Sequence, residues 1–210
     1  MKASLPYRIA QVLLLLALVR HLALALFIHP FADDFSYAVA GISTPLGERL
    51  LQEYTAWNGR YFSNVLVLRG PLVLGIGPGL PLYRLVAVVL ILLTAAAAYH
   101  CLRVLLPRIG RVSAGTAAVT FLLLFLHMMP DASEGFYWYT GAVTYQLANV
   151  LCLILAANWV RVLRTLDAVP ARWYVVQCVL VAVIAGENEL HAAFMVLTHF
   201  GLLVWGWKRV

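Results

Sequence analysis

The chain has 210 residues, of which 63% are hydrophobic and only 11% are charged. Soluble domains carry about 25% charged residues, so this composition excludes a soluble globular domain and predicts that most of the chain lies in lipid. The net charge of +6 does not indicate a nucleic-acid partner, because the basic residues stand at the ends of apolar segments rather than in one solvated patch.

Apolar segments recur along the chain at lengths suited to a bilayer. Residues 9–28, 82–106, 112–129 and 142–163 each approach or exceed the roughly 18 to 20 residues that span the hydrocarbon core. The next run, 173–207, is too long for one crossing and contains a polar interruption after Gly186, so we divide it into 173–186 and 190–207. The sequence therefore predicts an all-α polytopic membrane protein with about six transmembrane helices in one domain.

The first segment has a competing interpretation as a cleaved signal peptide, with the site at Ala23-Leu24-Ala25. Arg20 and His21 interrupt the apolar run before that site, which favours a retained helix. A charge inside a helix suggests a functional site, but a long arginine side chain can also extend toward the interface. We interpret Arg20 as structural or lipid-facing.

The distribution of charge predicts the orientation, since cytoplasmic loops carry an excess of Lys and Arg. With the N-terminus inside, ten of the fifteen basic residues fall in cytoplasmic segments and eight of the nine carboxylates fall outside. The sequence thus predicts an integral protein of a bacterial inner or plasma membrane with both termini cytoplasmic. The ten basic residues are Lys2, Arg8, Arg103, Arg108, Arg111, Arg161, Arg164, Arg172, Lys208 and Arg209, and the one inner carboxylate is Asp167.

The longest segment outside the bilayer is the first outer loop, at about residues 29–81. Its second half, 61–80, is apolar but contains two prolines and several glycines, and a crossing there would move every later loop to the other side. We therefore predict one or two interfacial helices in this part of the loop.

An acid pair, Asp33 and Asp34, begins this loop. Neighbouring residues on a helix point about 100° apart, so the two carboxylates cannot perform one task side by side. One is expected to face a reaction centre while the other caps a helix or binds a cation. The alternative is a helix N-cap with a second acid that the helix dipole favours.

Later in the loop come Trp57 and Arg60. A guanidinium is a permanent forked partner for phosphate, so Arg60 is a candidate for binding a phosphorylated substrate at the membrane surface. Arg84 is a weaker candidate, because an interfacial arginine also binds lipid headgroups.

The outer loop between the third and fourth segments combines Glu134 with the aromatic residues Tyr137 and Trp138. This composition suits a carbohydrate, because aromatic rings stack on sugar faces and carboxylates accept hydroxyl hydrogens. It also suits the aromatic belt that anchors helices at the interface, which we favour because consecutive aromatic residues cannot all face one ligand.

The turn between the last two segments contains Glu187 and His191, which are spaced as two ligands on one helical face. Asp34, Glu187 and His191 are the candidates for a divalent metal, and a plain polar turn is the alternative. Because the outer loops open on one side and consecutive helices tend to be neighbours, we expect Asp33, Glu134 and Glu187 to face one outer cavity.

The stretch Asp33-Asp34-Phe35-Ser36-Tyr37-Ala38, which follows a first helix and opens a long outer loop, resembles the GT-C class of membrane glycosyltransferases. The other outer-loop motifs, around Trp57, Tyr137 and Glu187, are similar to those of bacterial polytopic proteins grouped near that class. Members generally have more helices, so we expect a truncated, minimal or inactive relative.

The resemblance implies transfer of a sugar from a polyprenyl-phosphate carrier to a saccharide or lipid acceptor on the outer face. Asp33 would be the catalytic base, Asp34 would support it or bind a metal, and Arg60 would face the donor phosphate. A non-catalytic accessory protein for lipid-carrier or polysaccharide export is the alternative, and a small transporter is a third.

Overall fold

The computed structural model describes residues 4–164 and 170–207, and within them the chain forms helices and turns and no strand. The prediction of an all-helical chain is confirmed for these residues, and four described helical stretches are long and apolar enough to cross a bilayer, which is consistent with a membrane protein. They are α1 (Leu5–Ala25), α5 (Ile76–Leu105), α6 (Arg111–Met128) and the stretch Tyr139–Arg164. Lys2, Asp167, Lys208 and Arg209, which entered the orientation argument, lie outside the described residues.

The fourth stretch is built from three parts. It begins with α7 (Tyr139–Gly141), passes through a π-helical turn, η4 (Ala142–Gln146), and continues as α8 (Leu147–Arg164). Two further apolar helices, α9 (Ala171–Ala185) and α10 (Glu189–Trp207), meet at the turn formed by residues 186–188. Their apolar parts are shorter than the four spanning stretches, so the predicted count of six crossings is not established by helix length.

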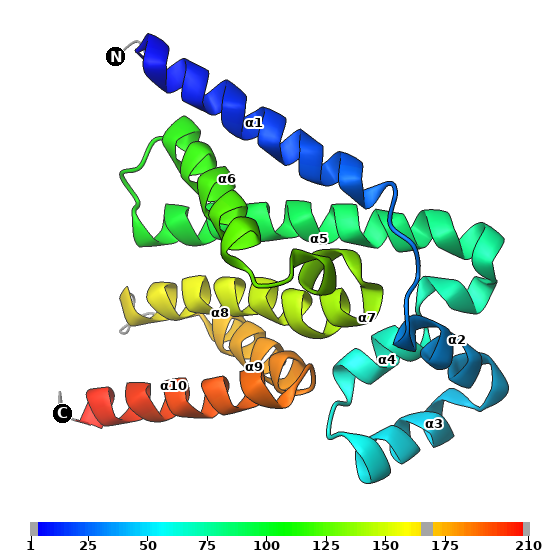
Figure 1. The fold of residues 1–210 in the computed structure, drawn as a ribbon. Coiled ribbons are helices and arrows are strands. Elements are labelled where there is room, and N and C mark those ends of the chain that lie inside the picture. Colours follow the sequence, from blue (N-terminus) through cyan, green and yellow to red (C-terminus); the bar gives the residue numbers. More distant parts are fainter. Residues whose placement is uncertain (1–3, 165–169, 208–210) are drawn as a thin grey trace.

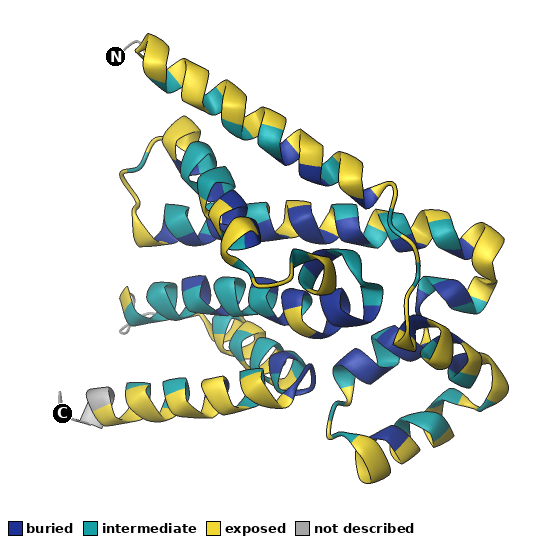
Figure 2. Cartoon of the chain, viewed as in Figure 1, coloured by how far each residue is buried: buried dark blue, intermediate teal, exposed yellow. Residues whose placement is uncertain are grey.

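The centre of the bundle is α5, which packs against both α6 and α8, while α8 packs against α9 and α9 against α10 (Figure 1). Ile91 of α5 and Leu122 of α6 are fully buried together with Phe136 from the following segment. The outer helices α1 and α10 are exposed along most of their length (Figure 2), and many of their exposed residues are large and apolar. Such surfaces are those expected of helices that face lipid.

The predicted first outer loop contains a lobe of short helices, which we call the α2–α4 lobe and define as residues 33–74. Gly75 follows it with φ +85°, a left-handed conformation that favours glycine, and there the chain turns into α5. Residues 61–75 of the apolar region 61–80 therefore contain only short helices, but residues 76–80, which were predicted to lie at the interface, belong to α5. The lobe consists of α2 (Asp33–Ser43), α3 (Leu46–Gln52), the π-helical η1 (Glu53–Trp57), α4 (Phe62–Leu68) and the 3-10 helix η2 (Pro71–Leu74).

Figure 1 shows the start of α1 and the end of α10 at the same end of the bundle, together with the turn between α5 and α6. The α2–α4 lobe and the turn between α9 and α10 lie toward the other end. The polar groups of the lobe and of that turn are thus brought to one end of the molecule.

Candidate functional site

The acid pair starts α2 at a strained turn. Ala32 has φ +44°, which is unfavourable for a residue with a side chain, and the chain reverses there into the first turn of the helix. Asp33 and Asp34 occupy that first turn, where the helix dipole favours negative charge. Asp33 is exposed, whereas Asp34 is buried. The two carboxylates therefore face different surroundings.

Asp34 connects three parts of the fold. Its Oδ2 accepts hydrogen bonds from the backbone N–H of Phe31 (3.0 Å) and the hydroxyl of Tyr83 in α5 (2.7 Å). Its Oδ1 accepts from both the backbone N–H (3.1 Å) and the hydroxyl (2.7 Å) of Thr140. Four donors around one buried carboxylate indicate a structural role, since they leave little capacity for a metal or a substrate.

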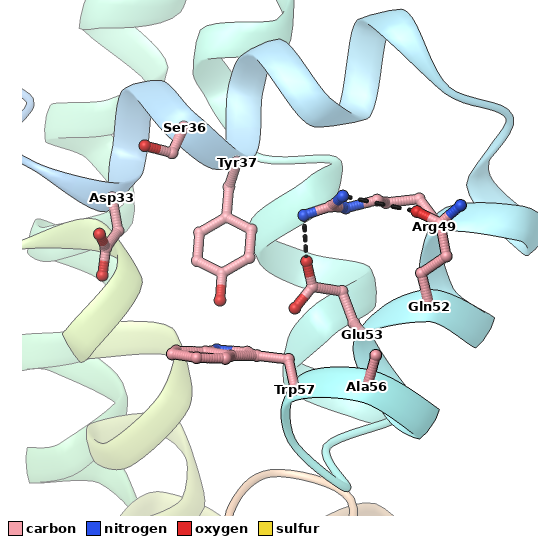
Figure 3. Close-up of a pocket in the computed structure, with 8 residues that line it drawn as sticks. All are labelled: Asp33, Ser36, Tyr37, Arg49, Gln52, Glu53, Ala56 and Trp57. Atoms are coloured by element: carbon pink, nitrogen blue, oxygen red, sulfur yellow. Dashed lines mark hydrogen bonds and ion pairs between the residues drawn. The ribbon is translucent and has the colours of Figure 1, made fainter.

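Asp33 stands between two adjoining cavities. The first, of about 520 Å³, lies within the α2–α4 lobe and is drawn in Figure 3. The second, of about 400 Å³, lies between the lobe and the bundle. Both are lined by Asp33, Tyr37 and Trp57. We call them the lobe cavity and the bundle cavity. The lobe cavity is further lined by Ser36, Arg49, Gln52, Glu53 and Ala56, and the bundle cavity by Asn58, Arg60, Trp138, Thr140, Gly141, Thr144, Tyr145 and Glu189.

Aromatic side chains form much of the wall. Tyr37 lies one helical turn after Asp33, and its hydroxyl points across the lobe cavity toward the Trp57 indole (Figure 3). Burial, followed by the nearby Glu53 and Asp33 charges, raises the pKa of Tyr37, so its hydroxyl stays protonated and able to donate. Trp57 itself is 78% exposed, so its indole ring is accessible for stacking against a ligand.

Both cations of the two cavities are already paired. Arg49 Nη2 lies 2.5 Å from Glu53 Oε1 (Figure 3). Arg60 binds Glu189 in a fork, with Nε to Oε1 at 3.1 Å and Nη2 to Oε2 at 2.9 Å. Asp33, by contrast, accepts no hydrogen bond from any residue that the structure describes. The charged lining residues sum to one net negative charge, which belongs to Asp33.

Two π-helical turns supply several of the side chains that line the cavities. The π-helical turn η1 carries Glu53 and Trp57, and the π-helical turn η4 carries Thr144 and Tyr145. A π-helical turn adds a residue to the helical turn and re-aims the side chains, and such turns occur frequently at functional sites. Trp57 of η1 and Tyr145 of η4 both line the bundle cavity, and the Arg60 guanidinium lies 5.7 Å from the centroid of the Tyr145 ring.

The lobe docks on the turn between α9 and α10. The backbone N–H groups of Phe62 and Ser63 donate to Gly186 O at 2.9 and 3.2 Å, and the Ser63 hydroxyl donates to Glu187 O at 2.7 Å. A side chain at position 186 would lie 2.3 Å from the Tyr61 ring, so this approach requires glycine. The contact places Arg60 opposite Glu189.

The expectation that Asp33, Glu134 and Glu187 share one cavity is wrong. Glu187 is fully buried and neither of its carboxylate oxygens has a hydrogen-bond partner. Burial raises its pKa to about 8, so it is mostly neutral at pH 7. The carboxylate of this turn that lines the bundle cavity is Glu189, not Glu187.

Glu134 and Tyr137 line a separate cavity of about 400 Å³ beside His29 and Asp131. The π-helical turn Ser133–Tyr137 packs against α5 and α7, and neither Glu134 nor Tyr137 lines the lobe cavity or the bundle cavity. Of the predicted aromatic group, only Trp138 borders both this cavity and the bundle cavity. Trp57, Arg60 and Trp138 are thus brought to Asp33, and Glu134, Tyr137 and Glu187 are not.

The three metal candidates are also separate. Asp34 is held by its four donors, Glu187 is buried alone, and the His191 ring contacts Asn188 Oδ1 (2.8 Å) and Asn149 Oδ1 (3.1 Å). Within residues 4–164 and 170–207, no group of three or more His, Cys, Asp or Glu side chains is placed to hold a metal ion. The residues present do not fit the predicted metal site.

Sequence reasoning missed Tyr37 and Glu189. Tyr37 could have been found, because it follows Asp33 by one helical turn. Glu189 could not, because its pairing with Arg60 joins residues 129 positions apart.

The chain matches no protein-family model, and no curated protein or solved structure was found to be similar to it. The function therefore has to be argued from the site.

Proposed function

We propose that α1, α5, α6, the Tyr139–Arg164 stretch, α9 and α10 all cross a bacterial inner or plasma membrane. The alternating directions of these helices, the common end of the first and last, and the charge distribution support this arrangement. Both termini are then cytoplasmic, and the lobe and bundle cavities open on the outer face.

At that face we propose a glycosyltransferase that moves a sugar from a polyprenyl-phosphate carrier to a hydroxyl of a saccharide or lipid acceptor. One observation carries the proposal: Asp33 is an exposed carboxylate without a hydrogen-bond partner among the described residues, between two cavities walled by aromatic rings. Aromatic walls suit sugar rings, and a free carboxylate suits the removal of a proton.

In the reaction, Asp33 takes the proton of the acceptor hydroxyl while the acceptor oxygen attacks C1 of the donor sugar. The bond between C1 and the phosphate oxygen breaks, and its electron pair leaves with the polyprenyl phosphate. Tyr37, protonated in this setting, donates a hydrogen bond to a sugar oxygen in the lobe cavity. Trp57 stacks on the sugar.

The donor phosphate needs a cation, and Arg60 is the nearest candidate in the bundle cavity. Because Glu189 already holds Arg60, the phosphate binds by replacing the Glu189 carboxylate on the guanidinium. Glu189 is 60% exposed and is therefore free to turn away into water.

The test is transfer of labelled sugar from a polyprenyl-phosphate donor in proteoliposomes. Asp33→Asn keeps the shape of the side chain but cannot accept the proton, so we expect turnover to fall by roughly 10²- to 10⁴-fold. Glu48→Gln is the matched control, since Glu48 is an exposed lobe carboxylate outside both cavities, and it should retain full activity. Equal activity in wild type and Asp33→Asn would refute Asp33 as the base.

A non-catalytic accessory protein remains the second candidate, and the paired state of Arg49 and Arg60 favours it. Cavities whose cations are neutralised suit a neutral polyhydroxyl compound better than a phosphate. Saturable saccharide binding by wild type, with no transfer from any polyprenyl-phosphate donor, would support this candidate against the transferase.

A further inference from the structure

A second polar cluster, outside the two cavities around Asp33, joins α1 to α6. Arg20 Nη2 lies 3.2 Å from His21 Nε2 and 3.4 Å from His127 Nε2. The two imidazole rings meet edge to face, with centroids 5.4 Å apart. One nitrogen of the guanidinium is thus held between two histidines from different helices.

The other ring nitrogens fix the tautomers. His127 Nδ1 lies 2.7 Å from Leu123 O and so must carry the hydrogen. The Tyr137 hydroxyl donates to His21 O (3.2 Å), so His21 Nδ1, at 2.9 Å from the same hydroxyl oxygen, also carries its hydrogen. Both Nε2 atoms are then acceptors, and they take the two hydrogens of Arg20 Nη2.

This arrangement orients the guanidinium but does not neutralise it. Neither of the described salt bridges involves Arg20, and the carboxylates of the nearby segment 129–138, Asp131 and Glu134, are not paired with it. Arg20 is exposed, and its Nε and Nη1 have no partner among the described residues. A permanent charge that faces lipid without a counter-ion is costly.

The position of the cluster identifies the counter-ion. Arg20 lies five residues before Ala25, the last residue of α1, which is about 7.5 Å along the helix axis. His127 is the residue before the last of α6, directly before the polar loop that supplies Tyr137. With α1 crossing the membrane as proposed above, the free side of the guanidinium is within reach of the lipid headgroups, whose anionic group is phosphate.

We propose that Arg20, oriented by His21 and His127, binds the phosphate group of a membrane lipid at the loop end of α1 and α6. Nη1, which the two histidines leave free, donates to a phosphate oxygen, and the permanent charge of the guanidinium attracts the anion. This inference does not depend on the proposed transferase activity.

The test uses the purified full chain in detergent micelles and a fluorescent phosphatidic acid, with the matching fluorescent diacylglycerol as the probe that lacks phosphate. Wild type should prefer phosphatidic acid, and Arg20→Leu should weaken that binding by at least about tenfold, because a hydrogen bond to a charged group contributes at least that factor. Leucine suits a lipid-facing helix, so the variant should fold.

Arg69→Leu is the matched control, since Arg69 is an exposed arginine of the α2–α4 lobe whose side chain makes no hydrogen bond in the described structure, and it should bind phosphatidic acid as wild type does. His127→Phe keeps the charge but removes one of the two acceptors, and it should bind measurably less. Equal binding by Arg20→Leu and wild type, or equal binding of the two probes by wild type, would overturn the proposal. Displacement of phosphatidic acid by equimolar inorganic phosphate would show a site for free phosphate and would overturn the lipid assignment.

Discussion

Glu187 offers a quantitative test of how the lobe and the bundle are joined. Its carboxyl group is fully buried at the turn on which α4 docks, and neither oxygen has a partner. The change to test is Glu187→Gln, which keeps the size of the side chain and removes its ability to ionise.

The expected magnitude follows from the pKa. Burial raises the pKa of Glu187 from an ordinary 4.5 to about 8. Between these values the folded protein keeps a proton that the unfolded chain releases, so the free energy of unfolding decreases as the pH rises. Holding this group ionised above pH 8 costs about 5 kcal/mol relative to a solvated carboxylate. Below about pH 4.5 the carboxyl is protonated in both the folded and the unfolded chain, and ionisation of Glu187 no longer lowers the free energy of unfolding.

The assay is unfolding by denaturing detergent at pH 5 and at pH 9, for wild type and Glu187→Gln. At pH 5 the two should agree within about 1 kcal/mol, and at pH 9 the variant should be more stable by several kcal/mol. The histidines contribute equally to the pH dependence of both proteins, so their contribution cancels when the two free energies of unfolding are subtracted. Glu48→Gln is the control and should follow wild type at both pH values. If the free energy of unfolding changed equally between pH 5 and pH 9 in wild type and Glu187→Gln, the buried, neutral state of this group would be refuted.

Three substitutions test the packing around Asp33. Gly186→Ala should destabilise the protein by about 1 to 3 kcal/mol, since the added Cβ meets the Tyr61 ring, and Gly47→Ala, where nothing lies within 4 Å, should not. Asp34→Asn should cost about 3 kcal/mol or more in unfolding experiments, because its NH₂ would face the hydrogen-bond donors that surround the carboxylate. Ala32→Gly should raise the free energy of unfolding by about 1 kcal/mol by relieving the positive φ, and an unchanged value would contradict the strain.

The helical ranges could be predicted because the bilayer sets the length of an apolar segment. The boundaries were less accurate: the first segment was predicted at 9–28 and the second to begin at residue 82, whereas α1 is Leu5–Ala25. In the structure α5 begins at Ile76 and contains Pro81 in its second turn, where one missing backbone hydrogen bond is tolerated.

The candidate site was predicted only in part. The separation of Asp33 from Asp34 follows from helix geometry and could be foreseen, whereas the loop contacts could not. Glu187 and Glu189 differ by two positions in a turn, and only the docking of Ser63 on this turn decides which of them is buried. Such pairings depend on tertiary packing, which one sequence without relatives does not reveal.

The central claim is that the cavities around Asp33 open on the outer face of a six-helix membrane domain, and labelling of single cysteines in intact cells tests it most directly. In a variant without Cys101, Cys152 and Cys178, a cysteine is placed at position 48 of the lobe, or at 108 or 172 at the opposite end of the bundle. A membrane-impermeant maleimide should label position 48 and leave positions 108 and 172 protected until the membrane is permeabilised. Labelling of 108 or 172 from outside, or protection of 48, would contradict the account.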